Sequence, residues 1–164
     1  MLRVILADDH PLIRIGQKVV IEASGKYKVV GEADGPDQLL ELLDTTACDV
    51  LVTDFAMPGD QQVDGYGLLS LLHRQYPALP VVLVTMFASV ATLRASFVHG
   101  VQAIVAKNAS ARELPQAINA VIAGQRFVSE CLRANCWRRG QVTSHGQRNC
   151  PARNAKWCAC SPAA

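Results

Sequence analysis

Three aspartates follow short apolar runs whose composition is typical of buried strands. Asp54 follows residues 50–53, and Asp8 and Asp9 follow residues 4–7. If these two strands are parallel neighbours, their carboxyl ends meet at one edge of the sheet and bring the three carboxylates together. Such a cluster is self-repelling unless a cation lies within it. The pattern therefore predicts a cation-dependent site at that edge.

Two further side chains are expected at the same edge. Thr85 ends the apolar run 81–84, and Lys107 follows the run 103–105 by two positions. A hard divalent cation such as Mg²⁺ binds carboxylate oxygens and keeps several waters, which leaves room for substrate oxygens. An aspartate can attack phosphorus to form an acyl phosphate, and a cation, an ammonium and a hydroxyl would offset the charge on the transferred oxygens. The set predicts a phosphate-accepting aspartate.

Each of these residues also has an ordinary structural explanation. Asp54 alone would suit a helix cap or a turn, Thr85 a strand terminus, and Lys107 a solvated loop. The presence of Asp8 and Asp9 favours a functional role for Asp54. Asp8 could support a bound metal without being a direct ligand. The position of Lys107 in the same strand-end plane favours a functional role for it as well.

Five β-branched apolar runs alternate with five amphipathic segments. The runs are nearly continuous, as expected for strands buried on both faces, and lie at 4–6, 29–30, 50–52, 81–84 and 103–105. The expected helices lie at 12–23, 38–46, 67–76, 91–99 and 112–123. Right-handed crossovers then give an α/β fold, a five-stranded parallel sheet with helices on both faces. His10 directly precedes the first helix and is expected to be a loop residue.

The composition of the chain changes near Glu130. The 164 residues are 50% apolar and 18% charged, which is ordinary for a globular domain. All 14 acidic residues lie at or before Glu130, where ten basic residues leave a net charge of −4. Five of the six cysteines and both tryptophans follow it, so the body has Cys48 alone. With no signal peptide and no bilayer-spanning run, we expect a cytoplasmic protein without a membrane partner.

Residues 1–128 resemble the receiver domain of bacterial two-component response regulators of the NarL/FixJ (LuxR-type) family, and most closely its RcsB-like members. The motifs that carry the resemblance are Leu6-Ala7-Asp8-Asp9-His10-Pro11, Thr53-Asp54, Met57-Pro58-Gly59-Asp60, Asp64-Gly65, Val84-Thr85-Met86, and Gly100 through Lys107. The resemblance implies a flavodoxin-like, doubly wound (βα)5 domain with strand order 2-1-3-4-5. It also implies a signalling domain rather than an enzyme, with at most slow autodephosphorylation.

The resemblance also implies a role for each acidic residue of the cluster. Asp54 is the implied phosphorylation site, and Asp9, Asp54 and the carbonyl of Ala56 are the implied ligands of Mg²⁺. Asp8 would hold the metal through its water shell. The phosphoryl group would come from a sensor histidine kinase, a phosphotransfer protein or a small phosphodonor.

The implied switch departs from the pattern of many receivers. Thr85 would contact the phosphoryl group and Lys107 would pair with it, but the aromatic residue that many receivers place three positions before this lysine is replaced by Ile104. Movement of Thr85 toward the phosphoryl group is therefore expected to shift the face made by the fourth helix, fifth strand and fifth helix. The same face is the expected surface of a homodimer.

Residues 129–164 are expected to form an irregular tail, since 134–164 show no helical period and no acidic residue. A NarL-type regulator would continue into a helix-turn-helix domain, which this tail does not provide, so DNA binding is not expected. Read in another frame, the codons of residues 149–164 permit leucine-serine and then Glu-Arg-Glu, similar to the start of a LuxR-type DNA-binding domain. This pattern predicts a frame slip near residues 131–135 and a missing helix-turn-helix.

Two alternatives stay open. One is a metal site in the tail, whose candidate ligands are Cys131, Cys136, His145, Cys150, Cys158 and Cys160. Only Cys158 and Cys160 are close, and their spacing is one residue shorter than the usual zinc knuckle. The other is a Mg-dependent aspartate-nucleophile phosphohydrolase. Such enzymes usually separate nucleophile and acid/base by two positions after the first strand, whereas Asp8 and Asp9 are adjacent.

Overall fold

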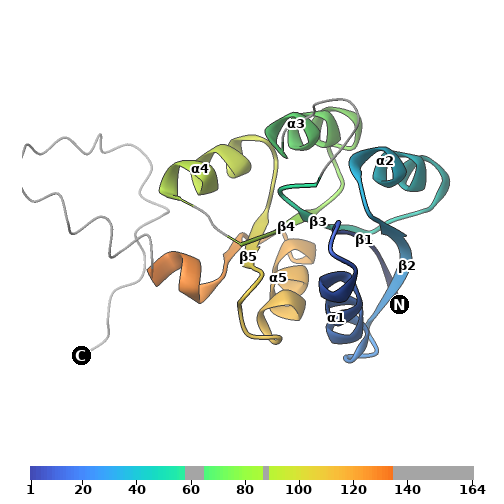
Figure 1. The fold of residues 1–164 in the computed structure, drawn as a ribbon, viewed down its shortest axis with the longest axis horizontal. Helices are drawn as coiled ribbons and strands as arrows, with labels where there is room; N and C mark the ends of the chain where they lie inside the picture. Colours follow the sequence, from blue (N-terminus) through green and yellow to red (C-terminus); the bar gives the residue numbers. More distant parts are fainter. Residues whose placement is uncertain (58–64, 87–88, 135–164) are drawn as a thin grey trace, which may run out of the picture.

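A parallel sheet of six strands in the order β2-β1-β3-β4-β5-β6 forms the centre of the protein. The computed structural model describes residues 1–57, 65–86 and 89–134 (Figure 1). Its strands are β1 (Leu2–Ala7), β2 (Tyr27–Ala33), β3 (Val50–Asp54), β4 (Val81–Thr85), β5 (Ala103–Ala106) and β6 (Phe127–Val128). The helices are α1 (Pro11–Glu22), α2 (Pro36–Thr45), α3 (Gly65–Gln75), α4 (Val90–Val98) and α5 (Glu113–Ile122). The predicted α/β class and all five predicted helices are confirmed.

The two faces of the sheet are covered by different helices, with α2, α3 and α4 on one side and α1 and α5 on the other (Figure 1). Successive residues of a strand point to opposite faces. Ile5 and Leu51 accordingly join the core cluster that includes α3, while Val4 and Val50 join the cluster that includes α5. Burial on both faces explains why the apolar runs are continuous rather than alternating.

The predicted strand number of five, in the order 2-1-3-4-5, is wrong, because a sixth strand extends the sheet beyond β5. Gly124, with φ of 71°, turns the chain after α5. Phe127 and Val128 then pair in parallel with Ala103 and Ile104. A two-residue strand is too short to produce a hydrophobic pattern, so it could not be predicted from periodicity.

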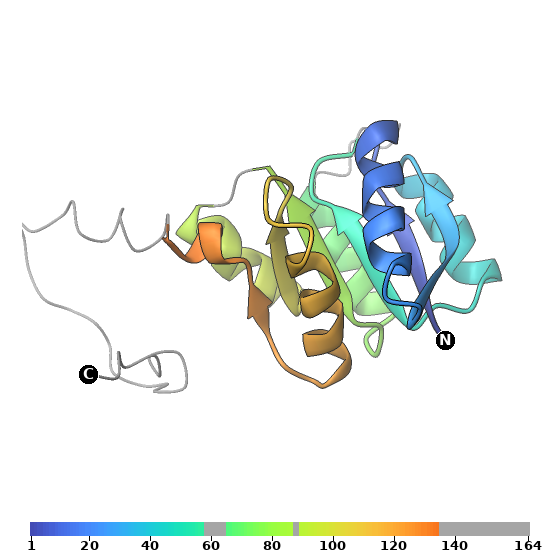
Figure 2. The same ribbon diagram turned by 90° about the horizontal axis from the view of Figure 1, so that it is seen from below.

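The described chain continues to pack against the sheet beyond residue 128, the domain end predicted from the sequence. The amide of Ser129 donates to the carbonyl of Ile104 at 2.9 Å, and its Oγ accepts from the amide of Ala106 at 3.1 Å. Residues 130–134 form a helical turn at the α4 end of the sheet (Figure 2), and Leu132 enters the core. The boundary at 128 stays a prediction. The frame slip was predicted near residues 131–135, and the structure does not test it. Most of the predicted tail, and all the candidate zinc ligands of the alternative except Cys131, lie in 135–164, outside the described residues.

Leu132→Ala is expected to lower the free energy of unfolding by roughly 2–4 kcal/mol, because a side chain only 3% exposed would leave a cavity in the core. Urea unfolding measures the difference. Arg133→Ala, at an exposed position in the same turn, is the matched control and should change little. Equal stability of Leu132→Ala and wild type would show that this turn does not belong to the folded unit.

An ion pair joins the start of β1 to the residue before β3. Arg3 Nη2 and Nε donate to the two carboxylate oxygens of Asp49 at 2.8 and 3.0 Å. These hydrogen bonds lower the pKa of Asp49 to about 2. A pKa below its unfolded value means that Asp49 adds stability above that value and loses it as the pH falls toward 2.

Asp49→Asn is therefore expected to lower the urea midpoint slightly at pH 7, because the pair lies at the surface. The difference from wild type should shrink steadily as the pH approaches 2. Urea titrations at pH 7, 4 and 2.5 measure it. A difference that grew at low pH would have the wrong sign for this ion pair.

Candidate functional site

The carboxyl ends of the central strands bring the predicted residues to one edge of the sheet. Asp8 directly follows β1, Asp54 ends β3, Thr85 ends β4 and Lys107 directly follows β5. The pairing registers place Ala7 beside Thr53, Asp54 beside Val84, and Thr85 beside Ala106. Parallel pairing with short loops after each strand is what converts these separate sequence positions into one site.

A buried ammonium joins two buried carboxylates at this edge. Lys107 Nζ lies 2.6 Å from Asp54 Oδ2 and 3.0 Å from Asp8 Oδ2, and the three side chains are 2%, 5% and 0% exposed. Burial opposes the charge of Lys107, but its hydrogen bonds to Asp54 and Asp8 outweigh burial and raise its pKa. Lys107 is therefore a fixed cation beside the predicted phosphoryl acceptor.

Asp9 and His10 complete an acidic cluster. Ligand atoms of Asp8, Asp9, His10 and Asp54 all lie within 4.8 Å of one another. His10 Nδ1 is 2.7 Å from Asp9 Oδ1 and 3.3 Å from Asp8 Oδ1, and more than half of its side chain is exposed. His10 caps α1 as expected for a loop residue, but its imidazole also belongs to the cluster, which the sequence analysis did not predict.

Backbone amides orient the two buried carboxylates. The amide of Phe55 donates to Asp54 Oδ1 at 2.6 Å, so Lys107 and Phe55 hold different oxygens of the same carboxylate. The amide of His10 donates to Asp8 Oδ1 at 2.9 Å. Ala56, whose carbonyl is a predicted metal ligand, is an exposed residue two positions after Asp54. The role of the Phe55 amide depends on backbone conformation and was therefore not predicted from the sequence.

Thr85 and Ile104 differ in their relation to the cluster. Thr85 is 5% exposed, and its carbonyl accepts from the amide of Lys107 at 2.8 Å, so the two residues are adjacent at the strand ends. Ile104 is fully buried within β5 and belongs to the core cluster on the α3 and α4 side. Ile104 therefore fills the core between the sheet and the α3 and α4 helices, and it is not part of the acidic cluster.

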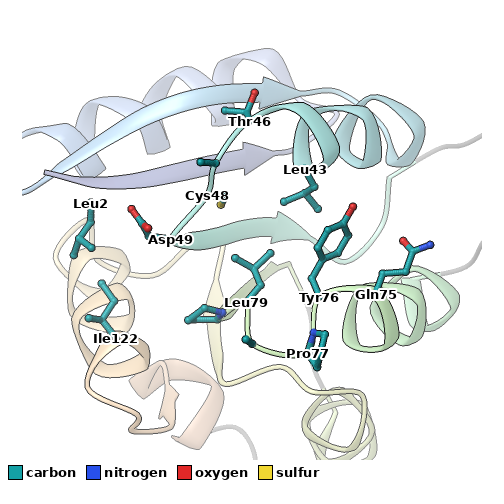
Figure 3. A pocket seen from close by; sticks show the side chains of 13 residues that line it. Leu2, Leu43, Thr46, Cys48, Asp49, Gln75, Tyr76, Pro77, Leu79 and Ile122 are labelled. Carbon is teal, nitrogen blue, oxygen red and sulfur yellow. The ribbon is translucent and has the colours of Figure 1, made fainter.

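The charges of the cluster suit a hard divalent cation. Three carboxylates face one ammonium, so the group has an excess of negative charge that oxygen-binding cations neutralise. A groove among the described residues lies elsewhere, at the other ends of the strands (Figure 3). It measures about 660 Å³, and its one carboxylate, Asp49, is already paired with Arg3. We therefore assign the site by its chemistry rather than by cavity size.

A doubly wound parallel sheet with an aspartate cluster and a buried lysine at its carboxyl edge defines the receiver class of signalling domains. The family model of the response regulator receiver domain matches residues 4–119, and the chain belongs to this family. The family membership that the sequence motifs implied is confirmed. The comparisons give no support to the phosphohydrolase alternative.

Two curated relatives show how far the likeness extends. Transcriptional regulatory protein RcsB of Escherichia coli (strain K12) is 34% identical over 131 residues, which cover 80% of this chain and 61% of RcsB. Response regulator GacA of Pseudomonas viridiflava is 33% identical over 129 residues, which cover 79% of this chain and 59% of GacA. The chain thus spans about three fifths of the length of these relatives.

Solved structures of receivers superpose closely on this fold. The isolated REC domain of RcsB from Salmonella enterica serovar Typhimurium, solved with the phosphomimetic BeF3⁻, gives a TM-score of 0.76 at 33% identity, over 81% of this chain and 96% of that one. A LuxR-family two-component response regulator from Aurantimonas sp. SI85-9A1 gives a TM-score of 0.76 at 29% identity, over 85% of this chain and 97% of that one.

The helices of the described residues are all too short or too polar to be candidate membrane spans.

Proposed function

We propose that the protein is a response regulator receiver that accepts a phosphoryl group on Asp54 from a sensor histidine kinase or a phosphotransfer protein. The observation that carries this proposal is the geometry of Asp54, whose two carboxylate oxygens are held separately by Lys107 and the Phe55 amide. Both the burial of Asp54 and the nearby ammonium suit an acceptor that must be oriented before it reacts.

The chemical step is a displacement at phosphorus. One oxygen of Asp54 attacks the phosphorus of the donor, the bond from phosphorus to the leaving group breaks, and the leaving group departs with the electron pair. Lys107 provides a fixed positive charge beside the three transferred oxygens. The hydroxyl of Thr85, at the end of the adjacent strand, is proposed to contact the same phosphoryl group.

The metal proposed for this site is Mg²⁺. Asp9, Asp54 and the carbonyl of Ala56 would be direct ligands, and Asp8 would act through water because Lys107 already pairs with both of its oxygens. The described donor atoms are oxygens, apart from one histidine nitrogen, and oxygens are the ligands that Mg²⁺ prefers. When bound, the ion would offset the negative charge of the transferred phosphoryl oxygens.

The output surface is proposed to be the face made by α4, β5 and α5. Thr85 connects this face to the site, because it ends β4 beside β5. Val98 of α4 is 78% exposed, so an apolar side chain is available for a homodimer on this face. With Ile104 in place of an aromatic residue, a shift driven by Thr85 is the proposed signal.

An apolar stripe on α1 supports a macromolecular phosphodonor. Leu12, Ile15 and Val19 lie on one side of the helix at helical spacing, and all three are exposed. Because α1 begins beside the acidic cluster, a kinase or phosphotransfer protein bound there would reach Asp54.

A cytoplasmic location belongs to the same proposal, and the free thiols of Cys48 and Cys131 are consistent with a reducing compartment.

A role in transcription regulation is proposed from the relatives. RcsB is named a transcriptional regulatory protein, and its structures include a complex with DNA. For this chain, the absence of a helix-turn-helix in residues 129–164 stays a prediction from the sequence. We therefore propose no DNA contact for the described residues.

Intact-mass analysis after incubation with acetyl phosphate and Mg²⁺ tests the proposed function. A receiver should gain a single phosphoryl group that is stable in acid and lost in base, and chelation of Mg²⁺ should prevent the gain. The same protein should not turn over a generic phosphate ester. Sustained ester hydrolysis without a covalent phosphoryl group would favour the hydrolase alternative instead.

A further inference from the structure

Phe55, which follows the proposed acceptor, connects Asp54 to α3. Its amide binds Asp54 Oδ1, while its ring contacts Tyr66 edge-on, with ring centroids 4.9 Å apart at 74°. A Cβ atom on Gly65 would lie only 2.3 Å from the Phe55 carbonyl oxygen, so the start of α3 approaches this backbone very closely. The position of Phe55 is therefore set from the side of α3.

Tyr66 in turn contacts the end of α4. Its ring lies 5.6 Å from the imidazole of His99, the residue that caps α4. His99 Nδ1 is 2.8 Å from Ser70 Oγ, and the same hydroxyl donates to the carbonyl of Tyr66 at 2.8 Å. Phe55, Tyr66 and His99 thus form one continuous series of ring contacts from Asp54 to α4.

We propose that Tyr66 is a positioning residue for the Asp54 carboxylate, acting through Phe55, and that the same ring contacts transmit the state of Asp54 to His99 at the end of α4. This inference rests on the proposed function of Asp54. It assigns to α3 and α4 a route that does not pass through Thr85 or through position 104, where this chain has the aliphatic Ile104.

The two parts of the proposal follow from one thermodynamic relation. If the contacting rings favour one orientation of the Phe55 amide, they favour one orientation of Asp54 Oδ1. A phosphoryl group on Asp54 then biases the rings by the same free energy, because coupling between two sites is reciprocal. Variants of Tyr66 should therefore change the response of His99 to a phosphoryl group on Asp54. They should also change the rate of phosphorylation, because Asp54 Oδ1 is then less well oriented for attack.

Tyr66→Leu, which removes the ring, is expected to slow phosphorylation by acetyl phosphate about fivefold, the effect of losing one edge-on aromatic contact. Tyr66→Phe keeps the ring and should restore the rate to within about twofold of wild type. Tyr76→Phe is the control for removal of a tyrosine hydroxyl elsewhere, since Tyr76 bonds Asp44 far from the cluster. Intact mass measured over time gives the rates.

Nuclear magnetic resonance of the His99 imidazole gives a readout that a purely structural role would not change. Beryllofluoride with Mg²⁺ should shift its resonances in wild type and in Tyr66→Phe, and the shift should fall by more than half in Tyr66→Leu. Ser70→Ala, at an exposed position, should also reduce the shift, because the Ser70 hydroxyl bonds both the Tyr66 carbonyl and His99 and so holds the two rings in contact. This variant keeps the test decisive if Tyr66→Leu does not fold.

The outcomes separate the inference from the proposed function. If wild type acquires a phosphoryl group, but Tyr66→Leu reacts at the wild-type rate or His99 shows no beryllofluoride shift, the inference is overturned while the function stands. With Tyr66→Leu unfolded, an unreduced His99 shift in Ser70→Ala overturns it equally. If wild type acquires no phosphoryl group at all, the proposed function itself fails.

Discussion

Asp54→Asn is expected to reduce phosphorylation by acetyl phosphate more than about 100-fold, to an undetectable level. The amide of asparagine is a poor nucleophile toward phosphorus. Asp8 is also held by Lys107 and a backbone amide, but Lys107 contacts both of its oxygens, whereas it contacts Oδ2 of Asp54 and the Phe55 amide holds Oδ1. Intact mass after a long incubation with acetyl phosphate and Mg²⁺ measures the loss.

The same variant should remain folded, which makes the loss interpretable. Asparagine has nearly the shape of aspartate, and its introduction removes one of three carboxylates that repel each other. Lys107 keeps Asp8 as its partner at 3.0 Å. Urea unfolding should therefore show equal or greater stability than wild type. If Asp54→Asn still took up a full phosphoryl group, the acceptor would have to be another residue.

Lys107→Met is expected to lower the free energy of unfolding by about 3–5 kcal/mol in the absence of Mg²⁺. Methionine fills similar space, but Asp8 and Asp54 lose their shared counter-ion while both stay buried. Removal of one partner from a buried ion pair has a cost of this size because it leaves an uncompensated charge. Denaturant titration at neutral pH with a chelator measures the effect.

Two controls give this prediction its specificity. Lys18→Met breaks an exposed pair with Glu32 and should have a far smaller effect, since surface ion pairs contribute little. Added Mg²⁺ should recover part of the stability lost in Lys107→Met, because a divalent cation also neutralises the carboxylates. Wild-type stability of Lys107→Met with the chelator present would mean that the ammonium does not balance these charges.

The fold could be predicted from the sequence because the strands are central and buried on both faces. Val50, Leu51 and Val52, for example, form an uninterrupted β-branched and aliphatic run that is typical of a strand covered on both faces. The boundaries of all five predicted helices were within about two residues of those observed. The edge strand β6 was missed because two apolar residues, half-buried at the sheet margin, produce no periodic signal.

The site could be predicted only in part, for a different physical reason. Residues at strand ends are visible in the sequence, and the structure does bring Asp8, Asp54 and Lys107 into contact. The Phe55 amide and the imidazole of His10 were missed because their roles depend on backbone direction and rotamer. Burial of Ile104 in the core likewise appears only once β5 is placed against its neighbours.

Contacts between α3 and α4 lay beyond sequence reasoning altogether. Tyr66 and His99 are 33 positions apart and belong to no motif, so nothing in the sequence pairs them. Their approach results from two helices packing on the same face of the sheet, which is a tertiary property (Figure 1).

Chemical location of the phosphoryl group is the most direct test of the central claim. Borohydride reduces an aspartyl phosphate to homoserine, so peptide mapping after treatment with acetyl phosphate, Mg²⁺ and borohydride identifies the acceptor. We predict homoserine at position 54 alone, with none when Mg²⁺ is chelated. Homoserine at position 8 or 9, or its absence from every peptide after full phosphoryl uptake, would contradict this assignment.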